Sequence, residues 1–337
     1  MPTPSPLVRR VLVAAVVLLV PLLPALAGQT AAQAAPPSYV ALGDSYSSGT
    51  GTRSYIDDGT SCQRSTYAYP SLIAAARGYS LNFRACSGAR VADVTNTQLS
   101  ALTASTSYVS VSVGGNDAGF SDVLTECATP WWAGNCDGAI DQAQAFINNT
   151  LPGRLSTLYA SIRAKAPNAK VVVVGYPRIF MGEDCNAGTW FSPAEMTRLN
   201  QTADLLNSRT ATQASAKGFS FANPTSRFVG HAVCDDVEWI NGLSNPISES
   251  YHPNRPGHSS GYTPTVSPLL TGATVTVGAS VRAASAAMAD DLAAQQRRYA
   301  DEDAAIRPES FRAPTRASLR SAAQREGIDL GRWLARH

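Results

Sequence analysis

Charged residues are scarce in this chain of 337 residues: only 15% are Asp, Glu, Lys or Arg, and the formal net charge is +2. Lysine is almost missing, because Lys165, Lys170 and Lys217 are the only three and the rest of the positive charge is arginine. Nucleic-acid-binding proteins gather basic residues into a stripe or patch, and the sequence has no such cluster. The composition therefore argues against a nucleic acid as partner.

Closely spaced metal ligands are missing as well. The four histidines are scattered, and no two cysteines form a Cys-x-x-Cys pair. Zinc sites in proteins are typically built from such spacings. We therefore predict no metal and no other cofactor. The cysteines are even in number, which in an exported chain indicates disulfides; they are Cys62, Cys86, Cys127, Cys136, Cys185 and Cys234.

The N-terminus has the features of a signal peptide. Two arginines at 9–10 precede an apolar stretch over 11–27, which ends in small residues. A membrane anchor is the alternative, but Pro21 and Pro24 interrupt the stretch and argue against it. We predict that residues 1–35 are a signal peptide and short leader, that no transmembrane anchor remains after cleavage, and that the mature protein is secreted.

Four short motifs contain the residue types that catalysis by a serine nucleophile requires. A serine hydroxyl becomes a good nucleophile only when a base such as histidine takes its proton. The oxyanion formed next needs N–H donors about 3 Å away. The motifs offer a nucleophile, donors and a base in one order: Gly43-Asp44-Ser45, Ser87-Gly88, Gly114-Gly115-Asn116-Asp117 and His252-Pro253-Asn254.

These motifs resemble those of the GDSL-type SGNH hydrolases, and most closely the secreted actinobacterial branch of lipases, esterases and phospholipases. The resemblance covers roughly residues 36–266. It implies that Ser45 is the nucleophile and that His252 is the general base. It further implies that the backbone N–H groups of Ser45 and Gly88 and the side-chain amide of Asn116 form the oxyanion hole. It also implies sequential disulfides, Cys62–Cys86, Cys127–Cys136 and Cys185–Cys234.

The residue that orients His252 is not decided by the sequence. Many relatives have an aspartate three residues before the base, where this chain has Glu249. A main-chain carbonyl can hold the imidazole Nδ1–H as well as a carboxylate can. Glu249 and the backbone carbonyl of Ser250 are therefore both candidates.

A second serine motif, Gly257-His258-Ser259-Ser260-Gly261, fits the nucleophile pattern of a different hydrolase fold. That pattern requires a strand before it and a catalytic histidine after it. Here the preceding segment is His-Pro-Asn-Arg-Pro, and only the terminal His337 follows. We therefore reject this motif as the nucleophile.

The apolar pattern predicts an α/β fold. β-Branched runs alternate with helical segments, which is typical of buried parallel strands. With the resemblance, this predicts a three-layer α/β/α sandwich of flavodoxin type with a mostly parallel five-stranded sheet. Ser45, Gly88 and Asn116 each follow a predicted strand, so all three should lie at one edge. The expected strands are 38–42, 81–85, 108–113, 170–175 and 219–222, and the expected helices 67–77, 139–164 and 193–217.

The chain divides, on this view, into a hydrolase domain over 36–266 and an extension over 267–337. The extension is Ala-rich and charged, with Pro308 and Pro314 interrupting it. We expect it to be helical or partly disordered and solvated, without a core of its own. Surface contact, a processed tail and a lid are further options.

The expected function is a secreted serine ester hydrolase that acts through an acyl-enzyme: a lipase or esterase, with phospholipase activity resting on the resemblance alone. The expected partner is an ester with an acyl chain, at a lipid surface or in solution, and the protein is expected to be a monomer. The alternatives are a carbohydrate O-acetyl esterase and a non-catalytic surface-binding protein. Aromatic residues are expected to form the rim of an acyl pocket: Tyr46, Phe120, Trp131, Trp132, Phe180, Trp190 and Phe191.

Overall fold

The computed structural model describes residues 1–6, 34–308 and 310–336, so most of the predicted signal peptide lies outside the described residues. The chain divides into two units, Met1–Ala35 and Pro36–His337, and the second contains the fold. Within the described residues, no helix is both long enough and apolar enough to cross a membrane.

A five-stranded parallel sheet forms the centre of the fold, as predicted. Its strands follow the order β2-β1-β3-β4-β5, and every neighbouring pair is parallel. Nearly all residues of β1, β3 and β4 are buried, which explains their uninterrupted apolar runs. The strands are β1 (Ser38–Gly43), β2 (Ser80–Phe83), β3 (Tyr108–Ser112), β4 (Lys170–Val174) and β5 (Ser220–Ala222).

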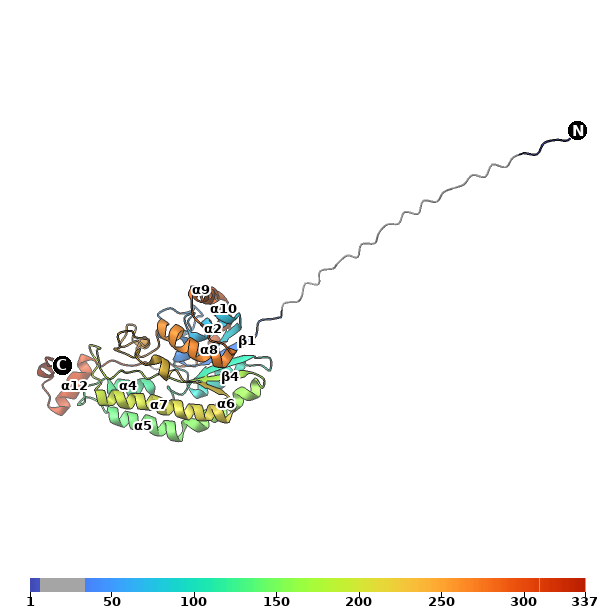
Figure 1. Cartoon of the computed structure of the whole chain (residues 1–337). Helices are drawn as coiled ribbons and strands as arrows, with labels where there is room; N and C mark the ends of the chain where they lie inside the picture. The colour runs from blue at the N-terminus through green and yellow to red at the C-terminus, as the bar shows by residue number, and fades with distance from the viewer. Residues whose placement is uncertain (7–33, 309, 337) are drawn as a thin grey trace. The chain divides into compact units, whose positions relative to one another are not determined.

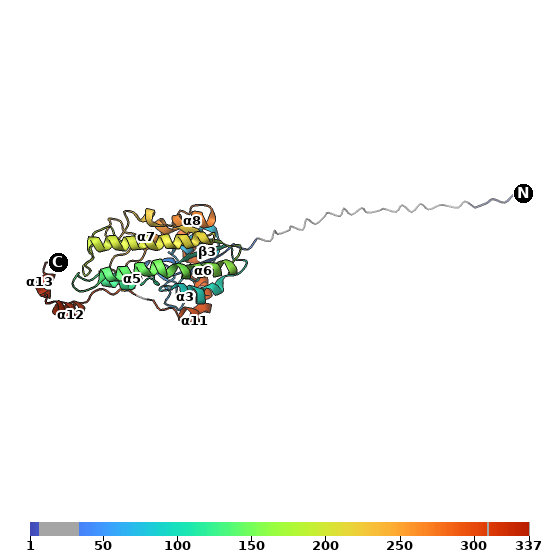
Figure 2. The same cartoon turned by 90° about the horizontal axis from the view of Figure 1, so that it is seen from below.

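Helices cover both faces of the sheet and confirm the three-layer arrangement. In Figure 1, α2 and α8 lie on one side of the sheet, and α5, α6 and α7 lie on the other. Figure 2 shows this layer from below: α5 and α6 follow one another end to end, and α7 runs alongside both. The helices of the hydrolase part are α1 (Ser45–Ser48), α2 (Tyr69–Arg77), α3 (Val91–Asp93), η1 (Val94–Gln98), η2 (Leu99–Ala101), α4 (Phe120–Cys127), α5 (Cys136–Asn149), α6 (Leu151–Lys165), α7 (Pro193–Ala216), η3 (Thr225–Phe228), η4 (Ile247–Glu249), η5 (Gly257–Tyr262) and α8 (Thr263–Thr271).

One predicted helix is two. The segment 139–164 reads as a single amphipathic helix, but α5 ends at Asn149 and α6 begins at Leu151. Pro152 stands in the first turn of α6, where its missing N–H costs nothing because that position has no intrahelical partner. The same proline would break a continuous helix, so the chain restarts there.

The start of α7 agrees with the sequence. Ser192 accepts a hydrogen bond from the N–H of Glu195, the Glu195 carboxylate accepts one from the N–H of Ser192, and Pro193 occupies the first helical position. This reciprocal cap satisfies donors that the helix leaves unpaired.

The C-terminal extension packs onto the hydrolase part instead of lying in solvent as we expected. Its elements α9 (Ala279–Ala287), α10 (Ala289–Gln296), η6 (Arg297–Tyr299), α11 (Ala300–Asp303), α12 (Arg316–Glu326) and α13 (Leu330–Leu334) are all helical. Leu292, Ile306 and Phe311 belong to the main hydrophobic core. The boundary predicted at 266 falls inside α8. The sequence did not reveal this packing, because the few apolar residues of the extension contact residues that are far away in the chain.

Candidate active site

Ser45 stands where β1 turns into the short helix α1. Gly43 ends the strand with φ 125°, and a Cβ there would lie 2.3 Å from the Ser112 carbonyl oxygen, so only glycine lets the turn pass β3 so closely. Asp44 caps α1, since its Oδ1 accepts from the Tyr46 N–H at 3.0 Å. Ser45 is 5% exposed. The turn therefore holds its hydroxyl in a sheltered place.

His252 lies beside this serine, with Nε2 2.9 Å from Ser45 Oγ. On the other side of the ring, Nδ1 lies 2.9 Å from the Ser250 carbonyl oxygen. A carbonyl can only accept, so Nδ1 carries the hydrogen and Nε2 of the neutral ring is the acceptor for the serine O–H. This tautomer is the one that a general base requires.

Glu249 contacts other groups. Its Oε1 accepts a hydrogen bond from the Tyr55 hydroxyl at 2.6 Å, and its Oε2 lies 3.5 Å from Arg53 Nε. Tyr251 adopts φ 60°, and this left-handed residue lies between Ser250 and His252, where the chain turns so that the Ser250 carbonyl meets the imidazole. Of the two candidate orienters, the carbonyl is the one in contact with His252.

The turns that carry Gly88 and Asn116 are joined by a hydrogen bond. Asn116 Nδ2 donates to the Ala89 carbonyl at 3.1 Å, which uses one of the two N–H groups of this amide. Gly88 has φ 83°, a conformation that favours glycine. Asn116 and Ser45 line the same cavity. The structure thus brings the sequence motifs after β1, β2 and β3 to one edge of the sheet.

Asp44 and Asp117 hold turns in place. Asp44 Oδ2 accepts from the Tyr176 hydroxyl at 2.5 Å, and that hydroxyl accepts from the Gly115 N–H at 3.3 Å, which links the serine turn to the asparagine turn. Asp117 accepts from the Val91 N–H at 2.8 Å. Burial raises the pKa of Asp44 to about 7, although its bonds from Tyr176 and Tyr46 oppose the shift.

Burial has the opposite effect on the base. It lowers the pKa of His252 to about 4, even though the bond to the Ser250 carbonyl favours the protonated ring. The ring is therefore neutral at physiological pH and available to take a proton.

An apolar cavity extends from Ser45 between α4, α5 and α7. Of the seven aromatic residues expected around an acyl pocket, Tyr46 and Phe120 line it. Trp132 and Trp190 instead pack against Trp333 of α13. Phe180 and Phe191 are buried beside Tyr251, and Trp131 is 80% exposed. The remaining walls are mostly aliphatic and were not anticipated: Val123, Leu124, Ala143, Ile147, Ile179, Leu199, Ala203 and Leu206.

Sequence comparison places these residues in a known group. The GDSL-like lipase/acylhydrolase family matches residues 41–259, a span that includes Ser45, Gly88, Asn116 and His252. The chain belongs to this family. As a GDSL-family member it is a carboxylic ester hydrolase.

Two solved structures resemble this GDSL hydrolase over almost their whole length. The extracellular lipase of Streptomyces rimosus is 42% identical with a TM-score of 0.65, and the match covers 69% of this chain and 99% of that one. Phospholipase A1 of Streptomyces albidoflavus NA297 is 46% identical with a TM-score of 0.65, covering 69% of this chain and 98% of that one. Lipase 1 of Streptomyces coelicolor is 46% identical over 247 residues, which is 71% of this chain and 91% of the relative.

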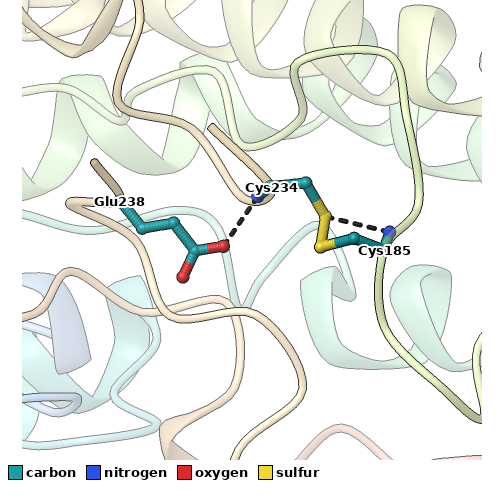
Figure 3. Close-up of side chains that lie close together, drawn as sticks. All are labelled: Cys185, Cys234 and Glu238. Carbon is teal, nitrogen blue, oxygen red and sulfur yellow. Dashed lines mark hydrogen bonds between the residues drawn. A yellow bond between two sulfur atoms is a disulfide. The ribbon is translucent and has the colours of Figure 1, made fainter. Parts of the chain in front are cut away.

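The cysteines of this GDSL hydrolase form the three sequential disulfides expected above: Cys62–Cys86, Cys127–Cys136 and Cys185–Cys234. Figure 3 shows the third beside Glu238, whose carboxylate accepts from the Cys234 N–H at 2.7 Å. These three side chains lie close enough together to bind a metal ion. Because both sulfurs are in a disulfide, neither is a thiolate, and the cluster is not a ligand set in this state.

The rejected serine motif lies in η5, which is a helical turn and does not follow a strand. His258 in this segment is fully buried against Tyr69 and Tyr262. His231 stacks on Trp239 at 3.7 Å between ring centroids, as expected for a structural histidine. The GDSL hydrolase thus brings one of these three histidines, His252, to the nucleophile.

Proposed function

We propose that the chain is a secreted lipase or esterase that cleaves carboxylic esters through an acyl-enzyme on Ser45. The observation that carries the proposal is the 2.9 Å contact between Ser45 Oγ and His252 Nε2 beside an apolar cavity. Secretion is supported by the signal-peptide pattern at the N-terminus and by the Streptomyces rimosus relative, which is described as extracellular.

In the acylation step, Ser45 Oγ bonds to the ester carbonyl carbon while its proton passes to His252 Nε2, and the carbonyl oxygen becomes an oxyanion. The backbone N–H groups of Ser45 and Gly88 and the second N–H of the Asn116 amide donate to that oxyanion. The tetrahedral intermediate then collapses, the carbon–oxygen bond to the alcohol breaks, and His252 gives its proton to the departing alcohol. The acyl group remains on Ser45.

Deacylation repeats these transfers with water. His252 takes a proton from water as the water oxygen attacks the acyl carbon, and returns it to Ser45 Oγ when the carboxylic acid leaves. During both steps the Ser250 carbonyl accepts from Nδ1 of the imidazolium and keeps the ring in position. We therefore propose Ser250, through its backbone, as the orienter of the base.

The cavity supports an acyl chain as the substrate group. Its walls are mostly aliphatic side chains from α4, α5 and α7, and a hydrocarbon chain placed there is removed from water. Phospholipids are a second candidate substrate, favoured by the 46% identity to the Streptomyces albidoflavus phospholipase A1.

The test is hydrolysis of p-nitrophenyl esters from C2 to C16 by the mature protein with its disulfides intact, beside Ser45→Ala. We expect serine-dependent turnover that persists for longer acyl chains, and covalent labelling of Ser45 by a phosphonate. Activity that falls steeply beyond acetate would favour an O-acetyl esterase. No turnover and no labelling would overturn the proposal in favour of a binding protein.

A lipid assay separates the two substrate candidates. The enzyme is given trioleoylglycerol and dioleoylphosphatidylcholine in matched emulsions, and released oleate is measured. Preference for the first indicates a lipase, and preference for the second indicates a phospholipase.

A further inference from the structure

The C-terminal extension is anchored inside the hydrolase part by buried ion pairs. The side chains of Arg64 and Arg84 are 0% exposed. Asp303, at the end of α11, lies 2.6 Å from Arg64 Nη2 through one carboxylate oxygen and 3.0 Å from Arg84 Nη2 through the other. A buried guanidinium is costly without such partners. The end of α11 is thereby fixed to these two arginines.

Both arginines lie close in sequence to the Cys62–Cys86 disulfide, which ends two residues before Gly88. Arg64 follows Cys62 by two residues and Arg84 precedes Cys86 by two, and the two cysteines are joined by a disulfide. Arg64 Nε also donates to the Ala85 carbonyl at 2.9 Å. Gly88 lies two residues after Cys86, so Asp303 is tied to the start of the loop that presents the proposed oxyanion donor.

Beyond α11 the chain runs directly against Gly88. A Cβ built on Gly88 would lie 2.5 Å from Pro308 Cα and 3.0 Å from the Arg307 carbonyl oxygen. The backbone of the extension therefore occupies the side of Gly88 where other residues carry a side chain. Ile306, just before this contact, is 1% exposed and belongs to the core.

The extension next contacts the segment that carries the base. The Phe311 ring packs edge-on against Tyr251, with 5.0 Å between centroids. Tyr251 lies between Ser250 and His252, and its carbonyl accepts from the Tyr46 hydroxyl at 2.7 Å. Phe311 thus packs behind the residue that connects the base to its proposed orienter.

These contacts lie behind the reacting groups and not across the acyl cavity. The cavity beside Ser45 is lined by residues from Asp44 to Leu206. The extension, in contrast, contacts Gly88 and Tyr251. The family match ends at residue 259, before any of the contacting residues of the extension.

We infer that Asp303, Pro308 and Phe311 are positioning residues of the active site, which hold the Gly88 N–H and the Ser250–His252 pair in their reactive arrangement from behind. The inference rests on the proposed function, because it takes Gly88 as an oxyanion donor and His252 as the base. A displaced oxyanion donor or base slows chemistry more than it weakens substrate binding, since the lost interaction is made mainly in the transition state.

The test compares Phe311→Ala and Asp303→Asn with Trp333→Ala. Trp333 is a matched aromatic of the same extension, and it packs on Trp132 and Trp190, neither of which lines the cavity beside Ser45. We measure kcat and KM for p-nitrophenyl butyrate, the rate of Ser45 phosphonylation, and thermal unfolding. We expect kcat to fall about 10- to 100-fold in the first two variants with KM within about 2-fold, a parallel fall in phosphonylation, and nearly normal values for Trp333→Ala.

Folded Phe311→Ala with wild-type kcat and labelling rate would overturn the inference, and so would a rise in kcat, which would indicate a cover. If Asp303→Asn does not fold, Phe311→Ala decides the outcome. If the wild-type enzyme shows no turnover that depends on Ser45, the proposed function is overturned, and this inference is overturned with it. Wild-type turnover with unchanged variants would overturn the inference alone.

Discussion

At the scale of single residues, the unusual feature is a histidine held by a main-chain carbonyl while a carboxylate stands three residues away. Glu249 is buried, yet it bonds to Tyr55 and approaches Arg53. Its role in the structure is to hold the loop around Arg53 and Tyr55 against the segment that precedes His252.

Glu249→Gln separates the two candidate orienters. Glutamine keeps an acceptor for the Tyr55 hydroxyl and removes the charge, so we expect kcat/KM for p-nitrophenyl butyrate to stay within about threefold of wild type. Loss of an orienting carboxylate typically lowers kcat by about 10⁴. A fall of that size would assign the orienter to Glu249 and not to the carbonyl of Ser250.

The pH profile reports the protonation of His252. Its pKa is lowered from 6.5 to about 4, so the neutral, active ring persists below the usual histidine range. We expect kcat/KM to remain on its plateau near pH 6 and to fall only as the pH approaches about 4. Stopped assays with a non-ionising ester between pH 4 and 8 measure this.

Asp44→Asn is the control for that profile, because the pKa of Asp44 is raised to about 7. Asparagine keeps an acceptor for the Tyr46 N–H and does not titrate. If kcat/KM of the wild type falls near pH 7 and this fall is absent in the variant, the fall is due to Asp44. That result would contradict the expectation for His252.

The sequence motifs identify the catalytic side chains, but they do not show where a backbone carbonyl points. Ser45, Gly88, Asn116 and His252 stand in motifs, and the structure brings their turns to one edge of the sheet. The sequence left Glu249 and the Ser250 carbonyl both open as the orienter of His252, because every residue has a carbonyl and its direction is not written in the residue types. The position of the Ser250 carbonyl depends on the φ of 60° at Tyr251, which no local pattern indicates.

At the scale of elements, the walls of the cavity are faces of α4, α5 and α7. Apolar periodicity predicts that such a face is buried, but not whether it borders a core or a cavity. Aromatic residues were for this reason a poor guide: Phe180 and Phe191 pack in the core, whereas Ala143 and Ala203 line the cavity.

Ala143→Phe tests this wall of the cavity. The larger side chain should fill space that a long acyl chain needs, so we expect C12 to C16 esters to lose about tenfold or more in kcat/KM, with C2 and C4 esters little changed. Ala145→Phe on the exposed face of the same helix is the matched control. An equal loss at all chain lengths in Ala143→Phe would point to general misfolding of the site.

At the scale of the whole molecule, the disulfides and the extension join distant segments. The Cys62–Cys86 bridge closes 24 residues and the Cys127–Cys136 bridge closes 9. Loop-closure entropy therefore makes the first the more stabilising, at about 3 kcal/mol. Removing it by Cys62→Ser with Cys86→Ser should lower the free energy of unfolding in urea by about this amount, and by more than removal of the second. The reverse order would show that strain or residual structure dominates.

The sheet and the disulfides could be predicted because their signals are local runs or follow a known family pattern. The packing of the extension could not be predicted. Buried arginines are rare, so nothing in the sequence indicates that Arg64 and Arg84 are buried. Asp58, one partner of Arg64, is close in the chain, but the partner that both arginines share in the extension, Asp303, lies more than 200 positions away. An ion pair between residues so far apart does not change the apolar periodicity of either segment, so the pattern cannot predict it.

The same distance along the chain determines how much of the protein must be synthesised before the arginines behind Gly88 can find their partners in the extension. Arg84 pairs with Glu302 and Asp303, which lie 218 and 219 residues later in the chain. A ribosome makes these carboxylates only after the sheet, the cavity helices and His252 have been synthesised. A chain that stops before α11 therefore lacks the ion pairs behind Gly88, although it contains the sheet, the cavity helices and His252.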